Sequence, residues 1–230
     1  MFNIFKKKQP DAAELETVRR EAILDYSYDQ SRVLYENNFE DGLKGWEPRG
    51  PVKEHFKKYN YAVGVELTED TPHSGSRCLK VFGRNEDWNG AVLDITDYTD
   101  DKIISYEVLV WVRLESDAEP CMLHLSLQTL SKIANIDFPE YRRLDDYTKS
   151  APFILANYRL PTTAAASADE QWKVNYQPGY STEDGWVLLR GKMKLRKSHY
   201  DKIFLYIETS EGKINTQDLF IDDFVLLEGE

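Results

Sequence analysis

An aromatic side chain and a carboxylate that share one face of a strand could together recognise a sugar ring. Tyr206 and Glu208 are two residues apart in the apolar run Ile203–Thr209, and side chains at i and i+2 lie on the same face of a strand. A flat ring can stack on the C–H face of a pyranose, while a carboxylate accepts hydrogen bonds from hydroxyl groups. A site built in this way also rejects ligands that lack the hydroxyls. An ordinary solvated strand face is the alternative interpretation.

Two further side chains could complete such a site from turns. Trp88 lies in a polar turn between the apolar runs Cys78–Phe82 and Ala91–Ile95. A large ring on a turn either folds back onto the domain or faces a flat ligand. Arg49 lies between a proline and a glycine, so a stiff backbone would hold its guanidinium in place. A surface salt bridge is the simpler role for this arginine.

Composition excludes several classes of partner. The 230 residues carry a net charge of -11, with 40 acidic against 29 basic side chains. Nucleic-acid binding needs clustered Lys and Arg to displace phosphate counterions, so nucleic acid is a poor partner, and so is an anionic membrane. No apolar run approaches the roughly 20 residues of a membrane helix. A neutral ligand suits this chain better.

The cysteines and histidines predict no zinc site. Cys78 and Cys121 lie in apolar runs and are expected to be buried free thiols, although a disulfide between neighbouring strands stays open. The four histidines are far apart, and none has the spacing of zinc ligands.

Alternating hydrophobicity predicts an all-β fold, a β-sandwich jelly roll, because about ten short strands are separated by turn residues. The expected strands are Val33–Phe39, Tyr61–Leu67, Cys78–Phe82, Ala91–Ile95, Ile103–Leu114, Cys121–Leu127, Gln171–Tyr176, Trp186–Leu195, Ile203–Thr209 and Asp218–Leu227. Residues 1–31 are predicted to form a leader that is helical over residues 11–26, and residues 32–230 the β-domain. Residues 130–170 lack this alternating pattern and are interpreted as one long loop insertion. The insertion either packs on the domain or forms one wall of a groove.

Two strands predict how the sheets are covered. Ile103–Leu114 is apolar on both faces and is expected to be covered on both. Cys121–Leu127 has one apolar face, whereas His124, Ser126 and Gln128 point the other way and predict a wet polar face.

Eight short motifs in a fixed order resemble the family 22 carbohydrate-binding modules, within the wider family 4/9/22 group. Each motif is weak alone, but together they cover residues 35–227. They are Asn-x-Phe-Glu-Asp-Gly, Gly-Trp-x-Pro-Arg-Gly, His-Ser-Gly-x-x-x-Leu-Lys-Val-x-Gly-Arg, Trp-Asn-Gly, Tyr-x-x-x-x-Trp-Val, Trp-x-x-Leu-x-Gly, Leu-Tyr-Ile-Glu and Ile-Asp-Asp.

The resemblance implies a jelly roll with a groove for a β-1,4-xylan chain, or for a β-glucan as in the wider group. Its groove residues correspond to Arg49, Trp88, Tyr206 and Glu208 in this sequence. One more groove aromatic precedes the Trp-x-x-Leu-x-Gly strand in the family, and either Trp172 or Tyr176 could take its place. Such modules are typically extracellular and linked to a glycoside hydrolase, although the first residues of this chain do not read as a signal peptide.

The resemblance also implies structural calcium. Calcium takes six to eight oxygen ligands from carboxylates and carbonyls. Glu36 and Glu40 near the first strand and Asp222 on the last are the candidate ligands, because the first and last strands commonly meet in this architecture. Two solvated acidic edges are the alternative.

Three classes of function remain, and the sequence favours a non-catalytic carbohydrate-binding module. An adaptor domain that binds protein would need an exposed apolar patch in place of a polar groove. A jelly-roll glycoside hydrolase would need two carboxyl groups about 5 to 9 Å apart. Glu208 could be one of these, and Glu107 is a conceivable partner that no motif supports.

Overall fold

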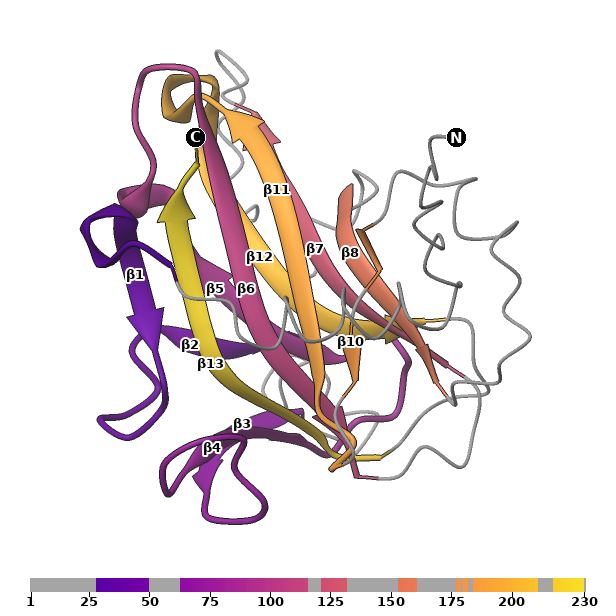
Figure 1. The fold of residues 1–230 in the computed structure, drawn as a ribbon. Helices are drawn as coiled ribbons and strands as arrows, with labels where there is room; N and C mark the ends of the chain where they lie inside the picture. The colour runs from indigo at the N-terminus through magenta and orange to yellow at the C-terminus, as the bar shows by residue number, and fades with distance from the viewer. Residues whose placement is uncertain are drawn as a thin grey trace, which may run out of the picture.

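A computed structural model describes residues 28–49, 63–115, 121–131, 153–160, 177–178, 180–181, 184–210 and 217–229 (Figure 1). The fold is all-β, and its regular helices in these ranges are short 3-10 turns, such as η1 (Gln30–Arg32) and η2 (Thr96–Tyr98). No helix in these ranges has the length and apolar character needed to cross a membrane. The predicted helical leader lies outside the described residues.

Two sheets form the sandwich. The seven-stranded sheet runs in the order β10–β11–β6–β13–β4–β3, and β1 also pairs with β13. The six-stranded sheet runs in the order β2–β5–β12–β7–β8–β9. The strands of the first sheet are β10 (Tyr180–Ser181), β11 (Val187–Leu195), β6 (Ile104–Leu114), β13 (Leu219–Glu228), β4 (Cys78–Phe82), β3 (Gly64–Thr68) and β1 (Val33–Asn37). Those of the second are β2 (Trp46–Arg49), β5 (Gly90–Asp94), β12 (Tyr200–Ser210), β7 (Cys121–Ser131), β8 (Phe153–Leu160) and β9 (Gln177–Pro178).

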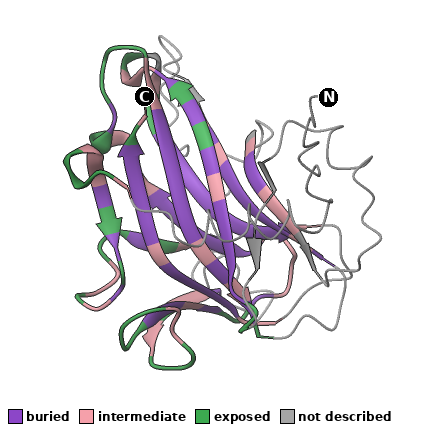
Figure 2. Ribbon diagram, in the orientation of Figure 1, coloured by how far each residue is buried: buried purple, intermediate pink, exposed green. Residues whose placement is uncertain are grey.

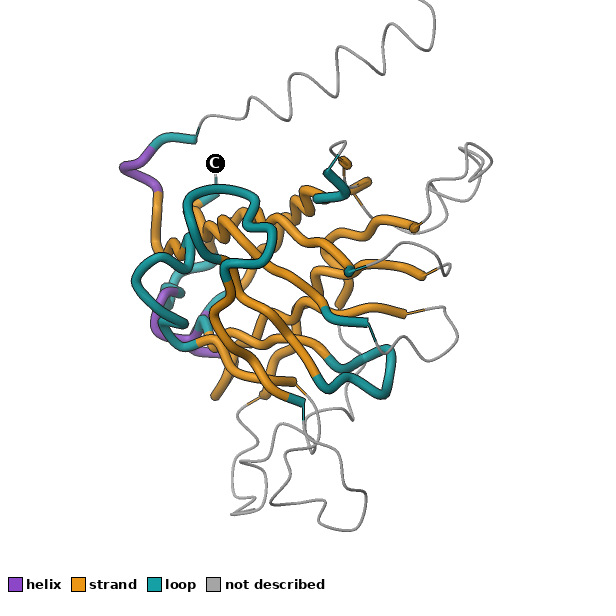
Figure 3. Tube along the Cα trace, turned by 90° about the horizontal axis from the view of Figure 1, so that it is seen from below, coloured by secondary structure: helices purple, strands orange, loops and turns teal. Residues whose placement is uncertain are grey.

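Neighbouring strands pair antiparallel, except β8 with β9, which pair parallel. Figure 3 shows the strands from below, joined by loops at their ends. Each strand turns alternate side chains inward, so that the apolar half of its sequence faces the other sheet.

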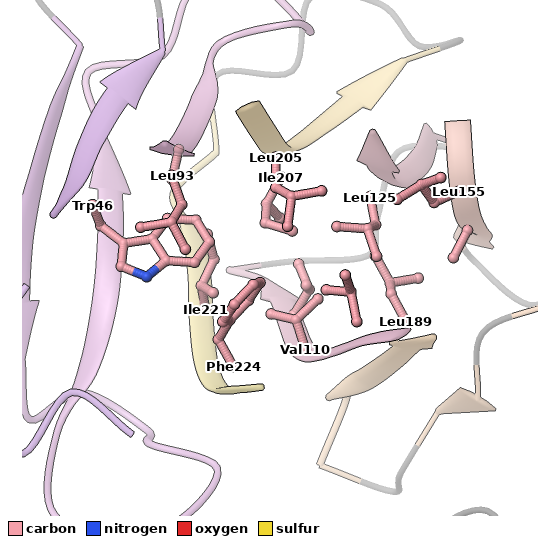
Figure 4. Packing of buried hydrophobic residues seen from close by; sticks show 14 of the residues in the cluster. Trp46, Leu93, Val110, Leu125, Leu155, Leu189, Leu205, Ile207, Ile221 and Phe224 are labelled. Carbon is pink, nitrogen blue, oxygen red and sulfur yellow. The ribbon is translucent and has the colours of Figure 1, made fainter. Parts of the chain in front are cut away.

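The core lies between the sheets. Figure 4 shows Leu125 and Leu205 of the six-stranded sheet facing Leu189 and Val110 of the seven-stranded sheet, with Leu93 beside Trp46. In Figure 2 most residues of β6, β11 and β13 are coloured as buried. This continuous apolar layer is what the period-two pattern predicts.

Aromatic packing closes one end of the core. Trp46 is 2% exposed and meets the edge of Phe224 at 5.1 Å between ring centroids. The short strand β2 therefore has a buried anchor, and its position beside β5 is fixed. The same anchor fixes the position of Arg49, three residues later, which pairs with Gly90 of β5.

Most predicted strands appear within a few residues of their expected bounds, and Cys78–Phe82 matches β4 at both ends. Both cysteines are buried free thiols, as expected. Burial raises the pKa of the Cys78 thiol to about 12, which keeps it protonated and unreactive at neutral pH. The predicted strand Gln171–Tyr176 lies outside the described residues.

The long segment 130–170 holds a strand that the sequence did not reveal. Strand β8 pairs with β7 from Cys121 to Leu127, and its Leu155 and Ala156 are buried. The register shifts between Leu125 and Ser126, so the inward and outward positions of the two strands do not stay matched along their whole length. Segment 153–160 forms a strand because it pairs with β7 and shares a core face with it. Its own short apolar run does not indicate this pairing.

Strand β5 approaches β12 closely at Gly90. A Cβ placed on this residue would clash with the carbonyl oxygen of Ile207 and lie 3.2 Å from the Cα of Glu208. We expect Gly90→Ala to lower the free energy of unfolding by about 1–3 kcal/mol, since backbone must move to admit the methyl group. Chemical denaturation would measure this loss. Glu47→Ala, at an exposed position on β2, is the matched control, and an equal effect of the two changes would contradict the prediction.

Candidate functional site

Arg49, Tyr206 and Glu208 meet on the outer face of the six-stranded sheet, the face turned away from the core. Arg49 on β2 pairs in register with Gly90 on β5, and β5 pairs in turn with β12. Arg49 forms an ion pair with the carboxylate of Glu208 across the intervening strand β5. Its guanidinium carbon also lies 3.9 Å from the centroid of the Tyr206 ring. We call these three residues the arginine trio.

The arginine trio is buried. Arg49 and Glu208 each expose 6% of their surface, and Tyr206 exposes 1%. Burial lowers the pKa of Arg49 to about 10, which leaves it charged at neutral pH. A buried ion pair whose members also stack on an aromatic ring is held in one geometry, and loss of either partner would leave an uncompensated charge.

The expectation of a wet face on this sheet is wrong. His124, Ser126 and Gln128 of β7 do point to the outer face, but they expose 5%, 0% and 2% of their surface. Glu208 lies opposite His124, and Tyr206 opposite Ser126, in the β12–β7 register. The face is therefore polar, as the alternation predicts, and at the same time covered. Alternation reports which residues share a face and does not report what lies over that face.

Trp88 lies in a tight turn beside the end of β12. The backbone N–H of Asn89 donates to the carbonyl of Glu86 at 3.1 Å, and the Asn89 side-chain oxygen accepts from the N–H groups of Asn85 and Glu86 at 3.0 Å. The N–H of Thr209 donates to the carbonyl of Asp87 at 3.1 Å, so the turn is tied to the residue after Glu208. Trp88 itself is partly exposed. The structure thus places the Trp88 turn beside the ends of β5 and β12, in the sheet that carries the arginine trio.

The remaining predicted groove aromatics, Trp172 and Tyr176, lie outside the described residues. Sequence reasoning also gave no role to Arg84, although the arginine ends the quoted motif Leu-Lys-Val-x-Gly-Arg. This side chain is buried and bonded to both carbonyls that flank Trp88. Its position at the end of β4 beside an aromatic turn was the available signal.

The candidate calcium ligands have other partners in this fold. Glu40 accepts from the N–H groups of Ser76 and Arg77, at 2.7 and 2.8 Å. Asp222 accepts from the N–H groups of His73 and Ser74, at 2.8 and 3.2 Å. The loop of residues 73–77 is therefore held at both ends. Asp222 on the last strand binds its beginning, and Glu40, which follows the first strand, binds its end.

Glu36 does not join Glu40 and Asp222. It is exposed on β1, opposite Val225 of β13. In the part of the chain that the structure describes, no three His, Cys, Asp or Glu side chains are arranged to hold a metal ion. These three residues do not fit a calcium site as they are placed here, and calcium binding itself stays a prediction.

Chelation tests that prediction. Loop N–H groups hold Glu40 and Asp222 in this arrangement, so these hydrogen bonds alone predict an unchanged melting temperature with chelator, whereas the calcium prediction requires a fall. Differential scanning calorimetry with and without chelator, followed by addition of excess calcium, measures the effect. A fall in melting temperature that calcium reverses would show that the chain binds a stabilising ion elsewhere or in another arrangement.

Glu107 lies on the far side of the sandwich from Glu208. It is 3% exposed on the outer face of the seven-stranded sheet, where it forms ion pairs with Arg190 and Arg32. Two sheets and the core separate the two glutamates. A hydrolytic pair of Glu107 and Glu208 is therefore excluded, because the carboxylates would have to flank one glycosidic bond.

Comparison with known proteins points to one kind of domain. Residues 31–135 match a family model described as a carbohydrate binding domain, CBM_4_9. The chain is 24% identical over 182 residues to endo-1,4-beta-xylanase C of Paenibacillus barcinonensis, a match over 79% of this chain and 12% of the xylanase. The chain thus spans about an eighth of that curated relative.

Solved structures share the fold. The CBM22-1 xylan-binding domain of Paenibacillus barcinonensis Xyn10C superposes with a TM-score of 0.55 at 19% identity, covering 85% of this chain and 94% of that domain. The CBM22-1–GH10 modules of a Clostridium thermocellum xylanase, complexed with xylohexaose, give 0.55 at 18% identity, over 86% of this chain and 29% of the other. The jelly-roll fold and the family resemblance predicted from sequence are confirmed.

Proposed function

We propose that this chain, which carries a carbohydrate-binding domain and folds as a family 22 module, binds a β-1,4-linked xylan chain without hydrolysing it. The observation that carries the proposal is the meeting of Arg49, Tyr206 and Glu208 on one sheet face beside the Trp88 turn. Stacking surface and hydroxyl-bonding groups are the two things that sugar recognition in water requires.

Each group has a distinct role in the proposed complex. Trp88 is the part-exposed ring, so it offers the first stacking surface to a xylose unit. Glu208 accepts hydrogen bonds from sugar hydroxyls, and Arg49 donates to them. Because the arginine trio is covered, contact with Tyr206 and Glu208 requires a rearrangement that exposes them. The ion pair with Arg49 then holds the carboxylate ready in the orientation that the ligand needs.

Two observations support binding without catalysis. The carboxylate of Glu208 is already engaged by Arg49, and Glu107 lies on the opposite face of the sandwich. The modules that the chain resembles are described as xylan-binding domains. We propose that the partner is xylan, with a β-glucan as the alternative ligand, and that a glycoside hydrolase is the kind of enzyme such a domain serves.

Affinity electrophoresis tests the proposal. The purified chain would be run through native gels that contain xylan, barley β-glucan or glucomannan, with bovine serum albumin as a non-binding reference. We expect retardation in the xylan gel, and retardation in the β-glucan gel would identify the alternative ligand. Migration equal to the reference in all three gels would contradict carbohydrate binding and favour the adaptor interpretation.

A further inference from the structure

Arg84 brackets the Trp88 turn from inside the domain. Its Nε donates to the carbonyl oxygen of Asn89 at 2.7 Å, and its Nη2 donates to the carbonyl oxygen of Asp87 at 3.2 Å. These are the residues directly before and after Trp88. A single planar group therefore fixes the direction of the backbone on both sides of the ring.

The same guanidinium ties the turn to two other segments. Nη2 also donates to the hydroxyl of Thr209 at 2.6 Å, and Nη1 donates to the carbonyl of Gln217 at 2.9 Å. The Thr209 hydroxyl donates in turn to the Asp87 carbonyl at 2.7 Å. Thr209 directly follows Glu208, so this network sets where Trp88 lies relative to the arginine trio.

Arg84 is costly to bury. It exposes 3% of its surface, and each of its four hydrogen bonds to the described residues goes to a neutral oxygen. Burial lowers its pKa to about 10, so it carries its charge at neutral pH. An apolar side chain would fill such a place with less desolvation. What only arginine supplies is a rigid fork that reaches three segments at once.

We propose that Arg84 is a positioning residue for ligand binding, which holds the Trp88 ring at a set distance and angle from Glu208. This inference rests on the proposed function for its effect on affinity. Its effect on the Trp88 turn does not depend on any ligand. Arg84 itself touches no sugar in this arrangement, because it lies beneath the turn.

The test is a double-mutant cycle with Arg84→Lys and Trp88→Phe. Lysine keeps the charge but has one nitrogen, which cannot bond both flanking carbonyls, Thr209 and Gln217 together. We expect Arg84→Lys to weaken xylan binding about tenfold in the parent, as loss of buried bonds to a charged group would do. In the Trp88→Phe background we expect a clearly smaller loss, because the group that Arg84 orients has been changed. Equal losses in the two backgrounds would overturn the proposal.

A second readout separates this inference from the proposed function. The tryptophan emission and acrylamide quenching of each protein are measured without ligand, and the contribution of Trp88 is taken as the difference from the matching Trp88→Phe protein. We expect Arg84→Lys to make Trp88 more accessible to the quencher. Unchanged quenching would overturn the positioning role even if xylan binds. If no protein binds xylan but quenching changes as expected, the proposed function fails and the role of Arg84 in the turn is upheld.

A matched arginine controls for the substitution itself. Arg77 has an exposed side chain in the loop that Glu40 holds. Arg77→Lys is expected to leave both xylan affinity and Trp88 quenching unchanged. A shift in either readout equal to that of Arg84→Lys would overturn the assignment to Arg84.

Discussion

Glu208→Ala is expected to remove xylan binding and also to lower the free energy of unfolding by about 3–5 kcal/mol. The change deletes the only ion-pair partner that a buried arginine, Arg49, has among the described residues, and it leaves the arginine's charge in a place that water does not reach. Urea denaturation measures the stability, and affinity electrophoresis in xylan measures the binding.

The double variant Arg49→Met with Glu208→Leu separates the two effects. Replacing both charges by apolar side chains of similar length removes the uncompensated arginine, so we expect stability to return to within about 1–2 kcal/mol of the parent. Xylan binding is expected to stay absent, because no group remains to bond the hydroxyls. Recovery of binding in this variant would show that Arg49 and Glu208 are structural residues alone.

Trp88→Ala is expected to reduce affinity for xylan about 30-fold while stability changes by less than about 0.5 kcal/mol. A tryptophan at the centre of a binding site is commonly worth about 2 kcal/mol or more. Trp88 lies part-exposed on a turn, and the hydrogen bonds that hold this turn come from backbone groups and from Asn89, Arg84 and Thr209. Isothermal titration with xylohexaose and thermal melting measure the two quantities.

Trp111→Ala is the matched tryptophan control. Trp111 lies on the outer face of the seven-stranded sheet, stacked on His73 at 4.0 Å, on the other side of the sandwich from the arginine trio. We expect this change to lower stability and leave the affinity for xylan unaltered. A loss of affinity equal to that of Trp88→Ala would place the binding surface elsewhere.

Short-range pattern determined most of the strands and which residues share a strand face. The alternation in Ile203–Thr209 put Leu205 and Ile207 in the core and Tyr206 with Glu208 on the other face, and the structure agrees. The turn around Trp88 was also predictable, since hydrogen bonds among Asn85, Glu86 and Asn89 form it locally. Periodicity works at this range because it is a property of the strand itself.

Only the tertiary structure decided how these residues act on one another. Glu40 and Asp222, the candidate calcium ligands, accept hydrogen bonds from the N–H groups of a loop that neither adjoins in sequence. Strand β8 forms through its pairing with β7. The position of Glu107, on the face opposite Glu208, follows from the sheet to which its strand β6 belongs. None of these relations has a local sequence signal.

The burial of the arginine trio is the clearest example of this division. The strand period put Tyr206 and Glu208 on one face without indicating what covers them, whereas Arg49 of β2 forms an ion pair with Glu208 across the intervening strand β5. Arg49 and Glu208 are far apart along the chain, and Arg84 likewise meets Thr209 across 125 residues. The two-residue period of a strand determines which residues line each of its faces. The ion pairs that these residues form and the segments that cover them depend on long-range packing, which the period does not encode.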